Sequence, residues 1–304
     1  RDKRSEIESQ AENLTGHLTK SNAFGIVPPK NNGSLRTRED FDSAFEHIMQ
    51  SADTRDGGFG RAPKFPQTFS IQFLLRHNYY SQNEQALQQA VLSLNKMITG
   101  GIYDQLGGGF ARYATDSEWL VPHFEKMLYD NALMIIALSE AYQLTKTPLY
   151  AETIRQTMSF VERELMNQDY GFFSALDADS EGVEGRYYVW EKSEIDNLLH
   201  EDAAIFCKYY DVTEEGNWDG KNILNVRKPV IEFAAEHGWE VDRLISTLHD
   251  GKTRLLENRS KRISPILDDK VLLNWNALMN YACSKAYAAL GDENYRVLAE
   301  RNMS

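Results

Sequence analysis

The chain is poor in cysteine, in long apolar runs and in positive charge. Two of its 304 residues are cysteine, Cys207 and Cys283. They lie far apart within helical patterns, and neither belongs to a Cys-x-x-Cys or Cys/His spacing, so zinc sites and disulfide frameworks are excluded. We expect two buried thiols in a reducing compartment, no metal, no bound cofactor and, by default, a cytoplasmic location.

The sequence also lacks the features of membrane and nucleic-acid binding. No apolar run approaches the roughly 20 residues that cross a bilayer. The chain opens on the charged run Arg1–Arg4 instead of a signal peptide. Its formal net charge is −12, without a stripe of Lys and Arg that could meet phosphates. We therefore expect neither a membrane nor a nucleic acid as partner.

The composition divides the chain near residue 36. Asp2–Leu18 reads as a polar helix, and residues 19–36 are rich in Pro, Gly, Asn and Ser, as in a linker. We expect residues 1–36 to be the tail of a preceding domain plus a linker. Residues 37–304 then form one helical domain, whose first helix Thr37 and Asp40 cap.

Beyond residue 37, apolar residues recur with the helical period, and glycine-rich loops separate the segments. The long loops cover residues 53–66, 100–122 and 169–190. Short β segments are expected only inside them, for example at Arg186–Trp190. The pattern predicts helices at about 37–52, 68–80, 83–98, 123–144, 148–167, 191–199, 202–209 and 242–258, with a last pair from Asp269 onwards.

An internal repeat indicates an array of helical hairpins. Asn131–Met134 matches Asn276–Met279 at an offset of 145 (276 minus 131), and Tyr150 matches Tyr295 at the same offset. Small residues also match between the two copies. A repeated hairpin packed in a ring needs such matching faces.

The long loops carry the candidate site. Each contains a Gly-Gly-Phe or Gly-Phe-Phe sequence followed by charged and aromatic residues. The candidate ligand-binding residues on and beside these loops are Arg61, Lys64, Asp104, Arg112, Tyr113, Asp116, Trp119, Tyr129, Arg186, Trp190, Asp269 and Trp275. Carboxylates that accept sugar hydroxyls and aromatic faces that cover sugar rings suit a polyol ligand.

Four residues are candidates for catalysis. His123 is expected at the start of a strong helix, where the helix dipole would favour the neutral imidazole, and Asp130 follows on the same face. Asp177 and Asp179 alternate on the third loop but lack the spacing of a calcium loop. We expect all four to converge with Arg112, Tyr113 and Asp269 at one concavity.

Five long motifs resemble one family. They are GGFGRAPKFP, GGIYDQLGGGFARYATDSEWLVPHFEKMLYDNALM, SALDADSEGVEGRYYVW, EGNWDGKNIL and LDDKVLLNWNALM. In this order they resemble thioredoxin-domain-containing proteins related to spermatogenesis-associated protein 20, including bacterial YyaL-like proteins. The resemblance implies a thioredoxin-like domain followed by an (α/α)6 toroid of the six-hairpin glycosidase class, similar to N-acylglucosamine 2-epimerases. We thus expect an all-α toroid, incomplete at its C-terminus, with short β pieces in the rim loops.

Three functions follow from these loops and the resemblance. The first is a sugar enzyme, either an epimerase or isomerase with two bases or a glycoside hydrolase with two acids. The second is a non-catalytic module that binds a glycan or peptide beside an intramolecular thioredoxin-like domain. The third is a scaffold whose loops are only well packed.

Overall fold

The computed structural model describes residues 10, 11, 15 and 37–303, and the chain divides into two units, residues 1–43 and 44–304. The linker predicted at 19–36 and most of the helix predicted at Asp2–Leu18 lie outside the described residues. At the start of helix α2 the Thr37 backbone N–H donates to Asp40, and the Asp40 N–H donates to the Thr37 hydroxyl. The predicted cap is confirmed.

Helices dominate the second unit, and its strands are two residues long. The helices are α2 (Arg38–Gln50), α3 (Thr68–Ser81), α4 (Glu84–Thr99), α5 (Leu128–Thr145), α6 (Pro148–Phe160), a π-helical turn (Val161–Leu165), α7 (Lys192–Leu199), a 3-10 turn (His200–Asp202), α8 (Ala203–Tyr209), α9 (Val230–His237), α10 (Val241–Arg259), α11 (Leu273–Leu290) and α12 (Glu293–Asn302). The strands are β1 (Tyr113–Ala114), β2 (Pro122–His123), β3 (Lys126–Met127), β4 (Ala175–Leu176), β5 (Asp179–Ser180), β6 (Val183–Glu184) and β7 (Leu267–Asp268).

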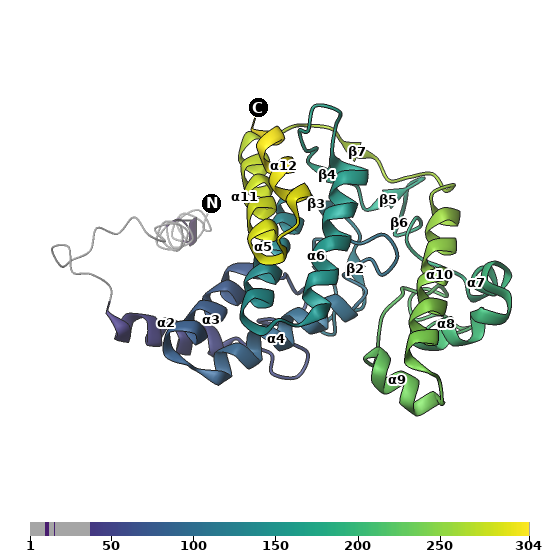
Figure 1. The fold of residues 1–304 in the computed structure, drawn as a ribbon, viewed down its shortest axis with the longest axis horizontal. Coiled ribbons are helices and arrows are strands. Elements are labelled where there is room, and N and C mark those ends of the chain that lie inside the picture. Colours follow the sequence, from purple (N-terminus) through teal and green to yellow (C-terminus); the bar gives the residue numbers. More distant parts are fainter. Residues whose placement is uncertain (1–9, 12–14, 16–36, 304) are drawn as a thin grey trace, which may run out of the picture. The chain divides into compact units, whose positions relative to one another are not determined.

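Three hairpins form the main body (Figure 1): α3–α4, α5–α6 and α11–α12. Helix α5 packs between α3 and α11, so these three form an inner row, each backed by its hairpin partner. Helix α5 is apolar on all sides because neighbours cover every face. The predicted all-α class, built from helical hairpins with β pieces confined to loops, is confirmed.

The internal repeat is present in the structure as well as in the sequence. Adding 145 to the bounds of α5 gives the bounds of α11, and α12 begins 145 residues after α6. Both inner helices end on a left-handed residue, Lys146 and Gly291, whose N–H donates to Tyr142 and Tyr287 respectively. The sequence match thus reflects two copies of one hairpin.

Each copy anchors a preceding loop with one asparagine. The Asn131 carbonyl accepts from the Phe110 N–H at 2.7 Å, and its amide donates to the Phe110 carbonyl at 3.1 Å. Asn276 makes the same two bonds to Phe172, at 2.8 and 2.9 Å. Buried backbone groups need such partners. The Gly-Phe loops are therefore fixed to the starts of the inner helices.

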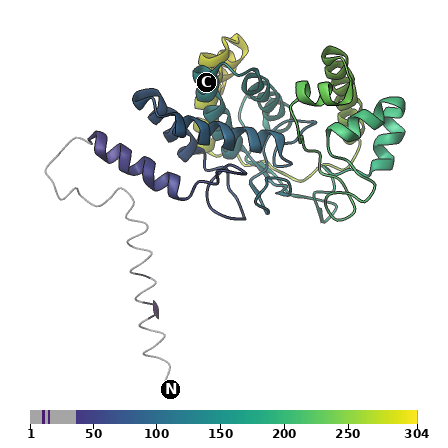
Figure 2. The same cartoon turned by 90° about the horizontal axis from the view of Figure 1, so that it is seen from below.

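The loops lie together along one side of the helices (Figure 2). Strand β4 lies in the third long loop. It pairs with β3 on one side and with β7 on the other in one antiparallel sheet. Segments near residues 126, 175 and 268 thus become neighbours. This is the arrangement in which residues far apart in sequence can share a site.

A second core holds α7, α8, α9 and α10 together around Trp190, Phe206 and Leu244. The sequence did not predict α9. Arg186–Trp190 was predicted as a β segment. The structure has turns there, with Trp190 alone bridging to Asn222, and the nearby strands are β5 and β6.

The described residues include both cysteines, and they can be compared with the expectations about membrane helices and metal ligands. Cys207 and Cys283 are buried, and burial raises the pKa of their thiols to about 11 and about 12. Among residues 10, 11, 15 and 37–303, no helix is long and apolar enough to cross a membrane. The same residues contain no cluster of metal-ligating side chains.

We expect Asn131→Ala to lower the free energy of unfolding by about 2–4 kcal/mol, because Phe110 would keep a buried N–H and carbonyl without partners. Urea denaturation measures this loss. Asn274→Ala, at an exposed position of α11, is the matched control and should change stability by less than about 0.5 kcal/mol. Equal losses in the two variants would show that the asparagine anchor does not stabilise the fold.

Candidate functional site

The centre of the site is the extended segment that leads from β2 to β3. Strand β2 pairs with β1, which places Tyr113 opposite His123 with their rings stacked 5.0 Å apart. Phe65 packs on the other side of Tyr113 at 4.9 Å. Side chains alternate along the segment, so Phe124 and Lys126 line an internal cavity, whereas His123 and Glu125 meet Arg112 and Tyr113.

His123 was predicted at a helix N-terminus, and this prediction is wrong. Helix α5 begins at Leu128, and His123 lies in β2. The apolar pattern of the following helix continues backwards to Phe124 and Met127. These two residues are buried, but they belong to the extended segment before the helix. No helix dipole acts on the imidazole, so its environment is set by neighbouring side chains.

Two carboxylates flank the imidazole. His123 Nδ1 lies 2.7 Å from Glu184 Oε1, and Nε2 lies 3.7 Å from Glu125 Oε2. A carboxylate beside Nδ1 favours the tautomer that carries its proton there, which leaves Nε2 as an acceptor. Glu184 thereby fixes the orientation of the His123 ring. Neither Glu125 nor Glu184 was named as a site residue from the sequence.

Asp130 is the acidic group of the cluster. Burial raises its pKa to about 7, and the nearby charge of Glu125 raises it further, against the opposing effects of Arg112 and a hydrogen bond from Tyr129. Its Oδ2 is buried without a hydrogen-bond partner among the described residues, as is Nε of Arg112. The other end of Arg112 donates to Glu125 at 3.0 Å. The carboxyl of Asp130 is therefore largely protonated below neutral pH.

Aromatic side chains border the acid. Tyr129 meets the edge of Trp275 with ring centroids 4.8 Å apart, so α5 and α11 both contribute to this border. Of the predicted residues, the structure thus brings together Arg112, Tyr113, His123, Tyr129, Asp130 and Trp275.

The other predicted carboxylates lie on the adjoining loops. Asp179 is exposed and pairs in register with Glu184, the partner of His123. Asp177 and Asp269 are exposed where β4 and β7 end, at opposite ends of that strand pair. No bond joins these three carboxylates to His123 or Asp130 within residues 37–303.

Two predicted arginines remain at the surface. Arg186 pairs with Glu181 at 3.2 Å and lines a polar groove with about 880 Å³ of empty space beside β5. Arg61 is exposed on the first loop. Both stay available to a ligand.

Lys64 does not face a ligand, contrary to the prediction. Its side chain is buried, and its ammonium group donates to Asp53 Oδ2 at 2.5 Å, to the Gly57 carbonyl at 3.0 Å and to the Ser117 carbonyl at 2.7 Å. An ammonium group has three N–H donors. All three are used, so Lys64 holds the first loop closed.

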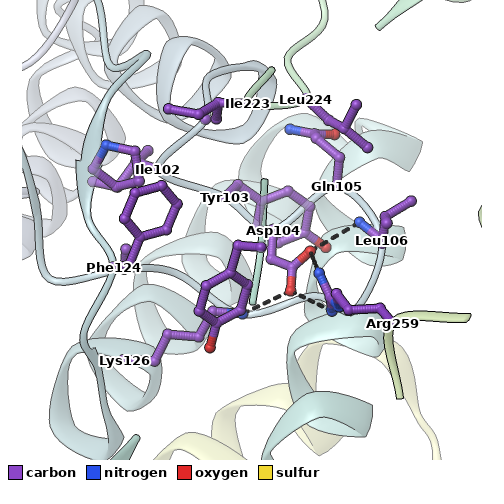
Figure 3. A pocket seen from close by; sticks show the side chains of 14 residues that line it. Ile102, Tyr103, Asp104, Gln105, Leu106, Phe124, Lys126, Ile223, Leu224 and Arg259 are labelled. Carbon is purple, nitrogen blue, oxygen red and sulfur yellow. Dashed lines mark hydrogen bonds and ion pairs between the residues drawn. The ribbon is translucent and has the colours of Figure 1, made fainter. Parts of the chain in front are cut away.

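Asp104 plays the corresponding part in the second loop. Arg259 donates to both of its oxygens at 2.9 and 2.8 Å, and Lys126 donates to Oδ2 at 2.8 Å (Figure 3). Burial alone would raise the pKa of Asp104, but the two cations outweigh it and lower that pKa; burial also lowers the pKa of Lys126 to about 8. Asp104 therefore ties α10 to β3 and is not free for a substrate.

Three more predicted contacts are structural. The carboxylate of Asp116 accepts from the N–H groups of Glu118, Leu120 and Val121 and so folds its own loop. Trp119 is fully buried, and its indole donates to the Asp56 carbonyl at 2.8 Å. Trp190 is fully buried beneath Arg262, at 3.9 Å. Burial keeps the two tryptophans from a ligand, and the partly exposed Asp116 carboxylate is occupied by its own loop.

Asp268 and Asp269 precede the last inner helix in the sequence, where a carboxylate can cap a helix start, so capping is one interpretation of them. The residue that caps α11 is Leu272, without a side-chain bond, and Asp268 instead pairs with Lys270 at 2.6 Å. The capping interpretation is wrong.

Fold and site together define a class: a helical-hairpin protein with an acid in the first turn of an inner helix and a carboxylate-oriented imidazole on the strand before it. Human spermatogenesis-associated protein 20 is 36% identical to the chain over 279 residues, which cover 82% of this chain and 36% of that protein. An uncharacterized protein of Caenorhabditis elegans is 34% identical over 296 residues, which cover 88% and 40% respectively. The chain is similar in sequence to spermatogenesis-associated protein 20 and spans little more than a third of the length of these relatives.

No protein-family profile matches the chain. Solved structures similar to it include a sugar epimerase from a ruminal bacterium and cellobiose 2-epimerase from Bacillus thermoamylovorans, each with a TM-score of 0.40 and 15% identity. They cover 85% and 87% of this chain, and 82% and 85% of the solved chains. At this similarity they do not bear on its activity.

We expect Asp104→Asn to destabilise the fold by about 3–5 kcal/mol, because Lys126 and Arg259 would remain buried without a counter-charge. Chemical denaturation measures the loss. Asp169→Asn, which removes an exposed carboxylate from the third loop, is the control and should be nearly neutral. A small loss for Asp104→Asn would mean that the two cations do not depend on this carboxylate.

Asp130 predicts a pH dependence of stability. Its folded-state pKa of about 7 lies above the ordinary value of 3.8, so the folded chain holds an extra proton between these values. The stability it contributes is fully present below about pH 4 and is lost as pH rises through about 7, by at most about 4 kcal/mol. Denaturation from pH 4 to pH 8 should show a steeper fall for the unaltered chain than for Asp130→Asn. Parallel curves would contradict a raised pKa.

Proposed function

We propose that the cluster around His123 and Asp130 is the active site of a carbohydrate-active enzyme. The observations that carry the proposal are the partly buried Asp130 carboxyl, whose pKa is raised to about 7, and the imidazole oriented by Glu184, with Glu125 near both. An acid and a base with distinct protonation states in one site are what proton-transfer chemistry requires.

The surroundings support a sugar as substrate. Tyr129 and Trp275 provide aromatic surfaces, while Asp179 and Arg186 provide polar groups on the adjoining loop. Apolar ring faces and hydroxyls are the two surfaces that a sugar presents. The buried, unpartnered atoms of Asp130 and Arg112 are an acid and a donor that a bound hydroxyl or carbonyl oxygen could meet.

Two reaction types remain within the proposal. In an epimerase or isomerase, His123 would remove a proton beside a carbonyl, while Asp130 would protonate the developing oxyanion. In a hydrolase, Asp130 would protonate the leaving oxygen, while Glu125 would act on the anomeric carbon or on a water. The Glu184–His123 pair favours the first type, and the Asp130–Glu125 pair favours the second.

The length of the relatives leaves room for another domain. We propose that residues 1–36 are the tail of a thioredoxin-like domain and a linker, and that residues 37–304 belong to the toroid. The activity of the whole protein would then combine both parts.

We expect the chain to turn over members of a panel of mono- and disaccharides, detected by NMR in D2O as deuterium incorporation or as released monosaccharide. Asp130→Asn and His123→Ala should each lower the rate by about 10²–10⁴-fold, because each removes a proton-transfer group. Asp169→Asn should leave it unchanged. Saturable sugar binding without turnover would favour the non-catalytic module instead, and neither binding nor turnover would end the proposal.

A further inference from the structure

A small cavity lies on the buried side of the segment from β2 to β3, opposite the side that carries His123. Apolar side chains form much of its wall (Figure 3): Ile102, Phe124, Ile223 and Leu224. The charged side chains in the wall are Asp104, Lys126 and Arg259. Its volume of about 30 Å³ is room for one or two groups of the size of water and too little for a sugar. We refer to it as the Arg259 cavity.

The wall of the Arg259 cavity carries more positive than negative charge. Lys126 and Arg259 are each 3% exposed, and within residues 37–303 the one carboxylate that both contact is Asp104. Glu164, whose charge also acts on Lys126, pairs with Arg163 at 2.8 Å. One positive charge therefore remains in excess, and the apolar surroundings strengthen its attraction for an anion.

Two polar atoms of the wall are buried donors without a partner among the described residues. They are Nε of Arg259 and the hydroxyl of Tyr188. The other two nitrogens of the guanidinium donate to Asp104. Burial raises the pKa of Tyr188 well above its ordinary value of 10, so the hydroxyl keeps its proton and can donate. A buried donor without an acceptor costs free energy, so both atoms call for an acceptor in the cavity that their side chains line.

Lys126 supplies a third donor beside them. Its ammonium group donates to Asp104 at 2.8 Å and to the Gly108 carbonyl at 2.9 Å, which uses two of its three N–H groups. Its nitrogen lies 4.8 Å from the centre of the Tyr188 ring, and the guanidinium of Arg259 lies 5.3 Å from the same centre. The three donors are therefore close neighbours.

We propose that the Arg259 cavity binds a small monovalent anion, chloride. Neighbouring donors and an excess of positive charge are what an anion requires, and the volume excludes larger anions. The bound ion balances the second cation. It also ties α10, which carries Arg259, to β3 and to the loop of Tyr188. Because the cavity lies opposite His123, this inference does not rest on the proposed function.

Melting in two matched salts tests the inference. The chain is melted in sodium chloride at about 0.2 M and in the same concentration of sodium methanesulfonate, whose anion is too large for the cavity. An ion that binds only the folded chain stabilises it, so we expect the melting temperature to be higher in chloride by about 3 °C. Equal melting temperatures would overturn the inference and leave water as the occupant.

Two matched tyrosine substitutions locate the effect. Tyr188→Phe removes one donor and should reduce the chloride-dependent rise to less than about 1 °C, because a hydrogen bond to an ion changes affinity by about tenfold or more. Tyr187→Phe makes the same change at a residue that lines the groove beside β5, and it should keep the full rise. Each variant is compared with itself in the two salts. A rise that survives Tyr188→Phe, or that Tyr187→Phe also removes, would show that chloride acts elsewhere.

Bromide gives the position of the ion directly. Crystals grown in sodium bromide should show an anomalous difference peak within hydrogen-bonding distance of Arg259 Nε and the Tyr188 hydroxyl. Peaks confined to the protein surface would contradict an anion in the Arg259 cavity.

Discussion

The structure depends on the need of buried backbone groups for hydrogen-bond partners. Some backbone groups of a Gly-Phe loop bond within the loop, as Asp104 does with Gly109, but the buried N–H and carbonyl of the phenylalanine need a partner on the helix. Asn131 and Asn276 satisfy Phe110 and Phe172 with one donor and one acceptor each. The inner helices therefore fix the position of these loops. The position of the residues that follow each phenylalanine is fixed with it.

The segment from β2 to β3 has one buried face, and the site lies on its opposite face. Phe124 and Lys126 point to the cavity, where Lys126 and Arg259 neutralise Asp104. Strong interactions on that face leave the segment little freedom. The backbone that carries His123 and Glu125 is thus held by the contacts of Phe124 and Lys126. This is how a loop can present catalytic groups with fixed geometry.

The sequence predicted those features that follow from periodicity or from repetition. Helical periods located most helices, and the matched Asn and Tyr residues revealed the repeated hairpin. His123 was misplaced because a two-residue strand has no period of its own and the apolar pattern of α5 extends through it. Lys64 and Asp104 were taken as ligand contacts because pairing partners such as Arg259, 155 residues from Asp104, leave no local signal.

Asp104 and Asp130 are two buried carboxyl groups in opposite circumstances. Two cations neutralise Asp104, as expected for a charge whose role is to hold the fold. Asp130 keeps an oxygen without a partner among the described residues and becomes neutral by binding a proton instead. A purely structural aspartate gains nothing from this state, because an apolar residue would fill the space at lower cost in desolvation. In the proposed function, the Oδ2 atom that lacks a partner would meet the substrate.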